Sequence, residues 1–146
     1  MQRITINKIK KKKGKVPITC LLAYSRDIAE ILDKYCDIIL IGDSVGMVLY
    51  GMKTTRDVSF DTMLLHAKTV KKFTKKSLVV FDMPYKTYLN KFDAYKNAKR
   101  VINLTKCDAV KLEGGKEMSK IIQYLTKKKN SSYGSHRFIA TVFKKF

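Results

Sequence analysis

The stretch CDIILIGDSVGM, residues 36–47, decides the fold. Its run of consecutive aliphatic residues stops at Gly42, and Asp43 and Ser44 follow directly. A short, unbroken apolar run that ends at a glycine is typical of a parallel β-strand covered on both faces. The stretch therefore predicts a buried strand whose carboxyl end carries a carboxylate and a hydroxyl group.

Two later segments repeat this pattern of an apolar run that closes with an acid. SLVVFDMP (residues 77–84) reaches Asp82, and DAVKLEGG (residues 108–115) reaches Glu113. Adjacent parallel strands lie about 4.8 Å apart and end at the same edge of a sheet, so these two acids and Asp43 can converge. Carboxylates at such a short distance repel one another unless a cation lies between them. Hard oxygen ligands of this kind favour Mg²⁺.

The remaining chain alternates between strand-like and helical patterns, and its 146 residues predict a single domain. We expect strands at residues 16–24, 36–44, 77–84 and 107–115, and helices at residues 4–15, 25–35, 59–76, 91–106 and 116–129. The first strand should be buried on both faces, and Ser25 is placed to cap the helix after it. Four strand–helix units leave two architectures open: a doubly wound sheet, or half of a (β/α)8 barrel of about 250 residues.

The composition limits the classes of protein to consider. The formal charge is +19, but nearly all of it is lysine spread along the chain, which favours a solvated surface over specific nucleic-acid recognition. No apolar run approaches the roughly 20 residues of a membrane span, and no secretory signal is evident at the N-terminus. The 3 cysteines are widely spaced, which fits a reducing cytoplasm and favours neither disulfides nor zinc.

The pattern around the acids has competing interpretations. Lys111 lies two residues before Glu113, so both side chains share one face of a strand, beside the expected ion. Each acid could instead be the N-cap of the next helix. His66 is interpreted as an ordinary helix residue. GDSVG fits G-x-S-x-G, but neither His66 nor His136 lies on a suitable loop, so a nucleophilic serine is not favoured.

Four motifs together identify a family. LIGDSVGMVLYG, LHAKTVKK, VVFDMPY and AVKLEGG, in this order, resemble ketopantoate hydroxymethyltransferase (3-methyl-2-oxobutanoate hydroxymethyltransferase) from about residue 3 to Lys129. The resemblance implies that residues 1–129 form the N-terminal half of a (β/α)8 TIM barrel, in a cytoplasmic homodecamer. It implies transfer of a hydroxymethyl group from 5,10-methylenetetrahydrofolate to 3-methyl-2-oxobutanoate, giving 2-dehydropantoate, with Mg²⁺. One departure is Ser25, where the family usually has an aspartate.

The resemblance also assigns roles to individual residues. Metal ligation falls to Asp43, Asp82 and Glu113. Contacts with the 2-oxoacid fall to Asp43, Ser44, Asp82 and Lys111. Mg²⁺ would act as a Lewis acid on the oxoacid, and Lys111 would add positive charge near the enolate. The general base of the family, a glutamate, has no counterpart in this chain, so we expect little or no turnover from it.

Two other functions stay open on the sequence alone. A Mg²⁺-dependent oxoacid lyase of a related barrel type would use the same carboxylates without a folate. A basic nucleic-acid-binding module would explain the charge, and salt-dependent binding would reveal it.

Residues 130–146, NSSYGSHRFIATVFKKF, depart from the family and do not read as a strand. Residues 130–142 can be encoded so that the next reading frame gives IPVMGHIGLLPQ, which resembles the fifth strand region of the family. An adenine-rich tract over the preceding lysines would allow such a shift. We therefore interpret residues 130–146 as a frameshifted tail, an interpretation that sequencing of the gene tests.

Overall fold

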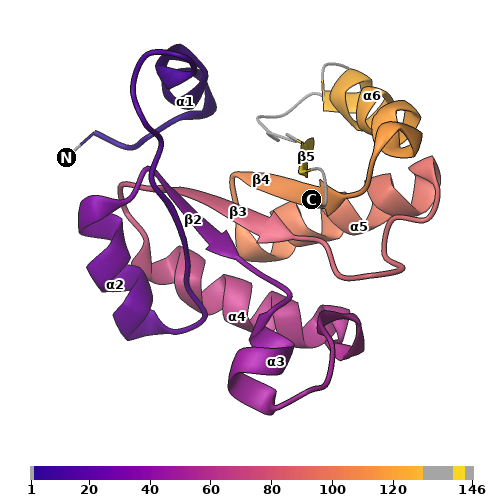
Figure 1. Ribbon diagram of the computed structural model, residues 1–146, viewed down its shortest axis with the longest axis horizontal. Helices are drawn as coiled ribbons and strands as arrows, with labels where there is room; N and C mark the ends of the chain where they lie inside the picture. The colour runs from indigo at the N-terminus through magenta and orange to yellow at the C-terminus, as the bar shows by residue number, and fades with distance from the viewer. Residues whose placement is uncertain (1, 130–139, 144–146) are drawn as a thin grey trace.

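The fold is a five-stranded parallel sheet with its strands in sequence order (Figure 1). The computed structural model describes residues 2–129 and 140–143. The strands are β1 (Cys20–Leu22), β2 (Ile38–Ile41), β3 (Leu78–Asp82), β4 (Ala109–Glu113) and β5 (Ala140–Phe143). A doubly wound sheet reverses its strand order at a switch point, whereas a barrel adds each strand beside the previous one. The observed order therefore selects the half-barrel.

Helices follow the strands as the sequence predicts, with one addition. The helices are α1 (Ile6–Lys12), α2 (Arg26–Tyr35), α3 (Val45–Tyr50), α4 (Phe60–Phe73), α5 (Lys91–Thr105) and α6 (Ser119–Lys129), with 3-10 turns η1 (Thr55–Asp57) and η2 (Lys116–Met118). The short helix α3 was not expected. It directly follows β2 and Ser44, and Gly51 ends it in the left-handed conformation with φ of 64°.

Side-chain capping fixes the starts of the longer helices. The Ser59 hydroxyl accepts a hydrogen bond from the Thr62 amide at the start of α4, and the Asn90 side chain accepts from two amides of α5. Ser25 occupies the N-cap position of α2 as predicted, but its side chain forms no capping hydrogen bond.

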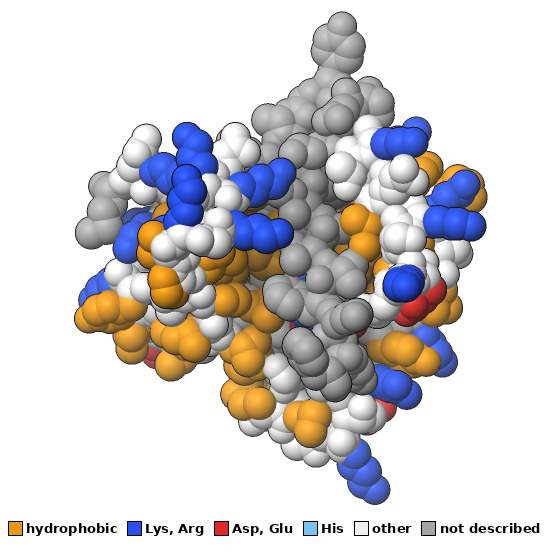
Figure 2. Space-filling model, turned by 45° about the horizontal axis from the view of Figure 1, so that its top comes forward, with side chains coloured by type: hydrophobic (Ala, Val, Ile, Leu, Met, Phe, Trp, Pro, Cys, Tyr) orange, Lys and Arg blue, Asp and Glu red, His pale blue; other side chains and the backbone are white. Residues whose placement is uncertain are grey.

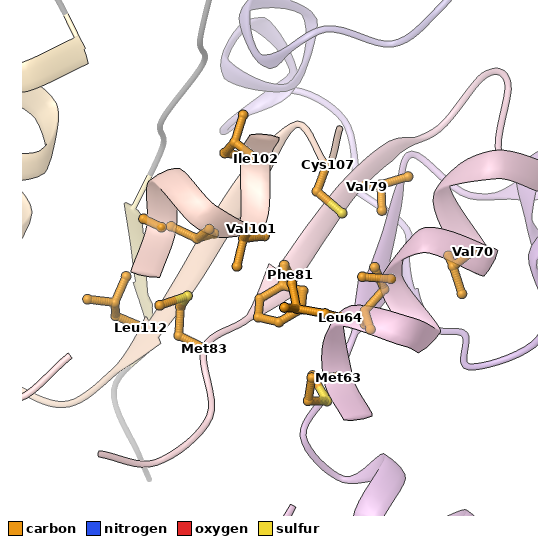
Figure 3. Close-up of a cluster of buried hydrophobic side chains, with 14 of the residues drawn as sticks. Met63, Leu64, Val70, Val79, Phe81, Met83, Val101, Ile102, Cys107 and Leu112 are labelled. Carbon is orange, nitrogen blue, oxygen red and sulfur yellow. The ribbon is translucent and has the colours of Figure 1, made fainter. Parts of the chain in front are cut away.

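The main core lies between the helices and one face of the sheet. Because side chains alternate along a strand, Val79 and Phe81 of β3 and Val110 and Leu112 of β4 point to this face. Figure 3 shows Val79, Phe81 and Leu112 within this cluster. They are fully buried against α4 and α5 residues such as Met63, Leu64, Val70 and Val101. Burial of an aliphatic or aromatic side chain contributes about 1.5–3 kcal/mol, so this layer provides much of the stability.

The opposite face of the sheet carries a second, smaller cluster. Leu78, Val80 and Ala109 are buried there, with Ile6 and Ile9 of α1 packed against them. Helix α1 therefore covers the end of the sheet where the strands begin (Figure 1). By the same alternation, Asp82, Lys111 and Glu113 lie on this second face, beyond the α1 contact, at the carboxyl ends of the strands.

The expected burial of the first strand is wrong. All residues of β1 are exposed, with Leu21 49% and Leu22 44% exposed, because β1 pairs with β2 alone among the described strands. The facing helix α2 likewise leaves Ile28 and Ile31 exposed. A closed barrel would cover this edge with its last strand.

The expectation that residues 130–146 contain no strand is also wrong. Ala140–Phe143 forms β5, which pairs in parallel with β4, so these residues extend the sheet as a fifth barrel strand would. Residues 130–139 and 144–146 lie outside the described residues, and the frameshift interpretation stays a prediction.

The surface agrees with the composition. Lysine and arginine side chains are spread over separate parts of the face in Figure 2 and alternate there with apolar side chains. Among the described residues, every helix is too short or too polar to cross a bilayer.

Candidate functional site

The acids predicted from the sequence lie at the carboxyl ends of neighbouring strands. Asp82 is the last residue of β3, Glu113 is the last residue of β4, and Asp43 lies two residues after β2. None of them is a helix N-cap, a position held instead by Ser44, Ser59, Asn90 and Gly115 in the helices that follow. The alternative that these acids only cap helices is therefore excluded.

Lys111 joins two of these acids. Its ammonium nitrogen lies 2.5 Å from Asp82 Oδ2 and 2.8 Å from Glu113 Oε1. The side chain of Lys111 is 9% exposed, that of Asp82 is 4% exposed, and that of Glu113 is 40% exposed. The prediction that Lys111 and Glu113 share one face is confirmed, and the lysine provides the positive charge that brings the two carboxylates together.

Burial changes the acidity of this cluster. Burial, with the nearby charges of Asp43 and Glu113, raises the pKa of Asp82 to about 7 despite its hydrogen bond from Lys111. Burial and the charge of Glu113 also raise the pKa of Asp43. Burial alone would lower the pKa of Lys111, but its hydrogen bonds to Asp82 and Glu113 raise it. The lysine therefore stays charged beside acids that are unusually easy to protonate.

One carboxylate oxygen in the cluster has no partner. Asp82 Oδ1 is buried and makes no hydrogen bond within the described part of the chain. An unsatisfied buried charge is unfavourable, so this oxygen marks a place for a ligand. Together with Asp43 it offers the hard oxygen donors that Mg²⁺ prefers.

These residues fit Mg²⁺ as a partly built site. Among residues 2–129 and 140–143, no group of three or more histidine, cysteine, aspartate or glutamate side chains is arranged so that it could hold a metal ion by itself. Mg²⁺ does not require one, because it usually takes one or two carboxylates and completes its shell with waters and substrate oxygens. The assignment of Asp43, Asp82 and Glu113 as metal ligands stays a prediction.

Beside the acids lies a chain of hydrogen bonds that the sequence did not reveal. The Ser44 hydroxyl lies 2.7 Å from the Tyr24 hydroxyl. His66 Nδ1 donates to the Tyr24 carbonyl oxygen at 2.6 Å, and His66 Nε2 lies 2.8 Å from the Tyr50 hydroxyl. Ser44 and Tyr50 stand at the two ends of α3, so this chain ties both ends to Tyr24. We define these residues, Tyr24, Ser44, Tyr50 and His66, as the Tyr24 network.

The Tyr24 network bears on two interpretations of the sequence. His66 lies in α4 as expected, and its side chain also links the loop after β1 to α3. The Ser44 hydroxyl bonds to Tyr24 and makes no hydrogen bond to His66, so a nucleophilic Ser–His pair is absent from the described residues. A tyrosine at the end of the first apolar run was the only signal in the sequence that could have indicated the network.

Backbone geometry also shapes this edge. Gly114, next to Glu113, adopts φ of +148°, and a Cβ atom there would lie 2.4 Å from Met118 Cγ. Gly46 in α3 faces Val58 so closely that a Cβ atom would lie 3.1 Å from Val58 Cβ. Both glycines therefore allow the loops after β2 and β4 to pack tightly beside the acids.

Comparison with known proteins gives the family. The model of the ketopantoate hydroxymethyltransferase family matches residues 3–134. The chain is 52% identical over 119 residues to 3-methyl-2-oxobutanoate hydroxymethyltransferase of Pelagibacter ubique, which covers 82% of this chain and 46% of the relative. It is 49% identical over 128 residues to the protein of the same name from Rhizobium etli, covering 87% and 47%. The chain thus spans about half the length of these curated relatives.

Solved structures support the same architecture. A 2,3-dimethylmalate lyase of the PEP mutase/isocitrate lyase superfamily superposes with a TM-score of 0.70 at 11% identity, covering 99% of this chain and 54% of that one. A phosphonopyruvate hydrolase bound to oxalate and Mg²⁺ gives 0.68 at 12% identity, covering 94% and 52%. At this identity the likeness shows the fold alone. The sequence match extends over the strands that carry the acids, and this chain belongs to the ketopantoate hydroxymethyltransferase family.

Proposed function

We propose that this chain provides the Mg²⁺- and oxoacid-binding site of a ketopantoate hydroxymethyltransferase. The complete reaction would convert 3-methyl-2-oxobutanoate, 5,10-methylenetetrahydrofolate and water into 2-dehydropantoate and tetrahydrofolate. The observation that carries the proposal is the Asp82–Lys111–Glu113 cluster, where a charged lysine and a buried, unpartnered carboxylate oxygen meet at the carboxyl edge of the sheet. Membership of the family supports this choice of reaction.

The cluster has the charges that a 2-oxoacid requires. Asp43, Asp82 and Glu113 would hold Mg²⁺. The bound ion would supply Lewis-acid polarisation of the oxoacid oxygens. Hydrogen bonds to two carboxylates fix the position of the Lys111 ammonium group. Lys111 therefore provides positive charge, without having to move, when negative charge develops on the ketone oxygen.

Ser44 is placed to orient the substrate. Its hydroxyl oxygen lies within hydrogen-bond distance of the Tyr24 hydroxyl. When Tyr24 donates this hydrogen bond, the Ser44 proton is left for a substrate carboxylate. Because the Tyr24 network fixes both ends of α3, Ser44 keeps its position without a bound substrate.

The bond changes define what these residues must support. A proton leaves C3 of the oxoacid. The electron pair of the broken carbon–hydrogen bond is stabilised as an enolate beside Lys111. C3 then forms a bond to the one-carbon unit, both carbon–nitrogen bonds that join this unit to the folate break, and water supplies the hydroxyl oxygen. The proton from C3 and one proton of the water end on the two folate nitrogens. We assign no described residue to the removal of the C3 proton.

Calorimetric binding of 3-methyl-2-oxobutanoate to the full chain tests this function. We expect binding to require Mg²⁺ and to weaken about tenfold or more in Lys111→Met, since a charge-assisted contact is lost. Ser44→Ala, which leaves the cluster intact, should weaken it less. Lys71→Met is the matched control, because Lys71 is equally buried against Asp108 but lies away from the carboxyl edge.

The same titrations can contradict the proposal. Binding that does not depend on Mg²⁺ would exclude the proposed site. Equal losses in Lys71→Met and Lys111→Met, with circular dichroism showing both variants folded, would assign Lys111 a structural role only.

A further inference from the structure

Glu113 lies beyond the end of the ladder that joins β3 to β4. The last paired residues of these two strands are Asp82 and Lys111, so Glu113 has no partner residue in β3. A backbone N–H group past the end of a ladder needs another acceptor. The Glu113 N–H group donates to the Tyr88 hydroxyl oxygen at 3.3 Å. A tyrosine side chain therefore takes the place of the missing strand at a residue that carries one of the acids of the site.

Tyr88 lies in the loop between β3 and α5, and contacts at both ends of this loop hold it in place (Figure 1). The Tyr88 ring packs against the main core. Where the loop begins, the Met83 amide donates to the Lys111 carbonyl oxygen of β4 at 3.0 Å. Just before Tyr88, the Thr87 carbonyl oxygen accepts from the Asn97 side chain of α5 at 2.7 Å. The Tyr88 hydroxyl is therefore fixed relative to both β4 and α5 before any ligand binds.

The loop keeps this shape at a conformational cost. Lys86, two residues before Tyr88, has φ of 65°, which a residue other than glycine rarely adopts. The Thr87 hydroxyl donates to the Pro84 carbonyl oxygen at 2.6 Å, and the Thr87 amide donates to the same oxygen at 3.1 Å, so the turn stays closed. Backbone strain that surrounding contacts hold in place is typical of functional segments. Here the strained turn directs Tyr88 toward the end of β4.

The Tyr88 side chain lies beside the acids of the site. It lines the same cleft as Asp43 and Glu113. Burial raises the pKa of Tyr88, the Glu113 amide opposes this effect, and the negative charges of Glu113, Asp82 and Asp43 raise the pKa further. The hydroxyl therefore keeps its proton. Within the described part of the chain this proton makes no hydrogen bond, so it is available to a water molecule among the acids.

Glu113 needs such support more than its neighbour Asp82 does. The side chain of Glu113 is 40% exposed, whereas that of Asp82 is 4% exposed and enclosed by the fold. Gly114 follows Glu113 directly with φ of +148°, so the chain leaves the strand at this point. Surrounding side chains therefore restrain Glu113 less than Asp82, and its backbone hydrogen bond has more influence on where its carboxylate lies.

We propose that Tyr88 is a positioning residue that acts through Glu113. Its hydroxyl fixes the end of β4, so the Glu113 carboxylate stays beside Asp43 and Asp82 at the proposed Mg²⁺ site. The inference rests on the proposed function and adds a residue to that site. Loss of a hydrogen bond that supports a metal ligand weakens metal binding roughly 10–100-fold. Because Tyr88 bonds to the backbone of Glu113 and not to its carboxylate, we expect an effect at the lower end of this range.

A double-mutant cycle on the full chain tests the inference, with Mg²⁺ binding measured by calorimetry in Tyr88→Phe, Glu113→Gln and the double variant. Tyr88→Phe keeps the ring in the core and removes only the hydroxyl. We expect it to weaken Mg²⁺ binding about tenfold, and to have no further effect in the Glu113→Gln background, because residues that act as one unit are not additive. Tyr95→Phe is the matched control, since Tyr95 packs against the same core from α5.

Tyrosine absorbance gives a second measurement that a purely structural role would not change. A cation that neutralises the acids alters the surroundings of the Tyr88 hydroxyl. Mg²⁺ should therefore change the near-ultraviolet difference spectrum of the wild type and of Tyr95→Phe. In Tyr88→Phe, with circular dichroism showing a folded chain, this change should be at least halved.

The outcomes separate this inference from the proposed function. Equal Mg²⁺ affinities in Tyr88→Phe and the wild type would overturn the role of Tyr88 alone. A tenfold loss that persists in the Glu113→Gln background would also overturn it, because Tyr88 would then act independently of Glu113. The same loss in Tyr95→Phe would assign the effect to core packing. Absence of Mg²⁺ binding in the unmodified chain would overturn the proposed function, and this inference with it.

Discussion

The two ends of the sheet use the same kinds of residue for opposite purposes. Where the strands begin, Asp33, Asp37 and Asp108 bind the backbone. Where the strands end, Asp82 and Glu113 form ion pairs with Lys111, and Asp43 lies at the same edge of the sheet. In barrels, the first end serves stability and the second end serves function.

The acids at the amino end are well satisfied. Asp33 accepts hydrogen bonds from the amides of residues 75–77 just before β3. Asp108 accepts from Lys71 at 2.6 Å, from Arg3 at 2.9 Å and from the Val79 amide at 2.9 Å. Hydrogen bonds that outweigh the opposing effect of burial lower the pKa values of Asp33 and Asp37. Asp33 and Asp37 are therefore stable in their charged form without any ligand.

The carboxyl end shows the reverse. Burial raises the pKa values of Asp43 and Asp82, and Asp82 Oδ1 has no partner in the described chain. The difference teaches that an acid which the fold leaves poorly satisfied is a better candidate for function than an acid which it satisfies fully.

Removal of each buried lysine should give the largest contrast between the ends. Lys111→Ala leaves the buried Asp82 without its cation, so it should lower the free energy of unfolding by about 3–5 kcal/mol. Lys71→Ala leaves Asp108 paired with Arg3, so it should cost less. Mg²⁺ should restore part of the loss in Lys111→Ala only. Urea denaturation with and without Mg²⁺ measures both effects. Equal recovery in the two variants would remove the distinction between the ends.

The pH dependence of stability should differ between the ends by an effect on the order of 2 kcal/mol. The lowered pKa values of Asp33 and Asp37 give stability that is present above the ordinary value near 4 and is lost as the pH falls. The raised pKa of Asp82 gives stability that is fully present below pH 3.8, the ordinary pKa of aspartate, and is lost as the pH rises toward about 7.

Denaturation of the Mg²⁺-free chain from pH 3 to pH 8 checks these opposite slopes. Asp37→Asn should flatten the acid limb, and Asp82→Asn should flatten the loss between about pH 4 and pH 7. A wild-type curve with no decline over the second window, or the same change of slope in both variants, would contradict the difference in pKa between the ends.

The sequence was sufficient to predict those parts of the fold and of the site that depend on the periodicity of the strands. The alternation of side chains and the shared edge of parallel strands predicted that Asp82, Lys111 and Glu113 would meet. Such patterns do not specify loops. His66 and Tyr24 are 42 positions apart, and their contact depends on the way α4 packs against the loop after β1. The exposure of β1 could not be predicted from the sequence either, because the apolar composition of a strand does not show whether the strand lies at the edge of the sheet.

A weaker effect should follow from loss of the Tyr24 network. His66→Ala removes two hydrogen bonds, which should cost about 1–2 kcal/mol of stability and weaken oxoacid binding severalfold through Ser44. Leu65→Ala, at an exposed neighbouring position of α4, is the control. Calorimetry and urea denaturation of both variants measure the two effects. Unchanged oxoacid affinity in a folded His66→Ala variant would show that the network is structural only.

The smallest effect concerns two lysines in the left-handed conformation. Lys86 lies in the loop between β3 and α5, with φ of 65°, whereas Lys106 is the C-cap of α5, with φ of 61°. Glycine at either position should raise the free energy of unfolding by up to about 1 kcal/mol. Urea denaturation of both variants measures this effect. A lower free energy of unfolding in both glycine variants would contradict backbone strain at these two positions.

The most direct test is the change in melting temperature on adding Mg²⁺ to the wild-type chain, Asp82→Asn and Asp37→Asn. A ligand that binds only the folded chain raises the melting temperature by mass action. We expect Mg²⁺ to raise it in the wild type and in Asp37→Asn, which starts from a lower value, and to have no effect in Asp82→Asn. A Mg²⁺-dependent increase of equal size in Asp82→Asn would contradict the assignment of the metal to the carboxyl end of the sheet.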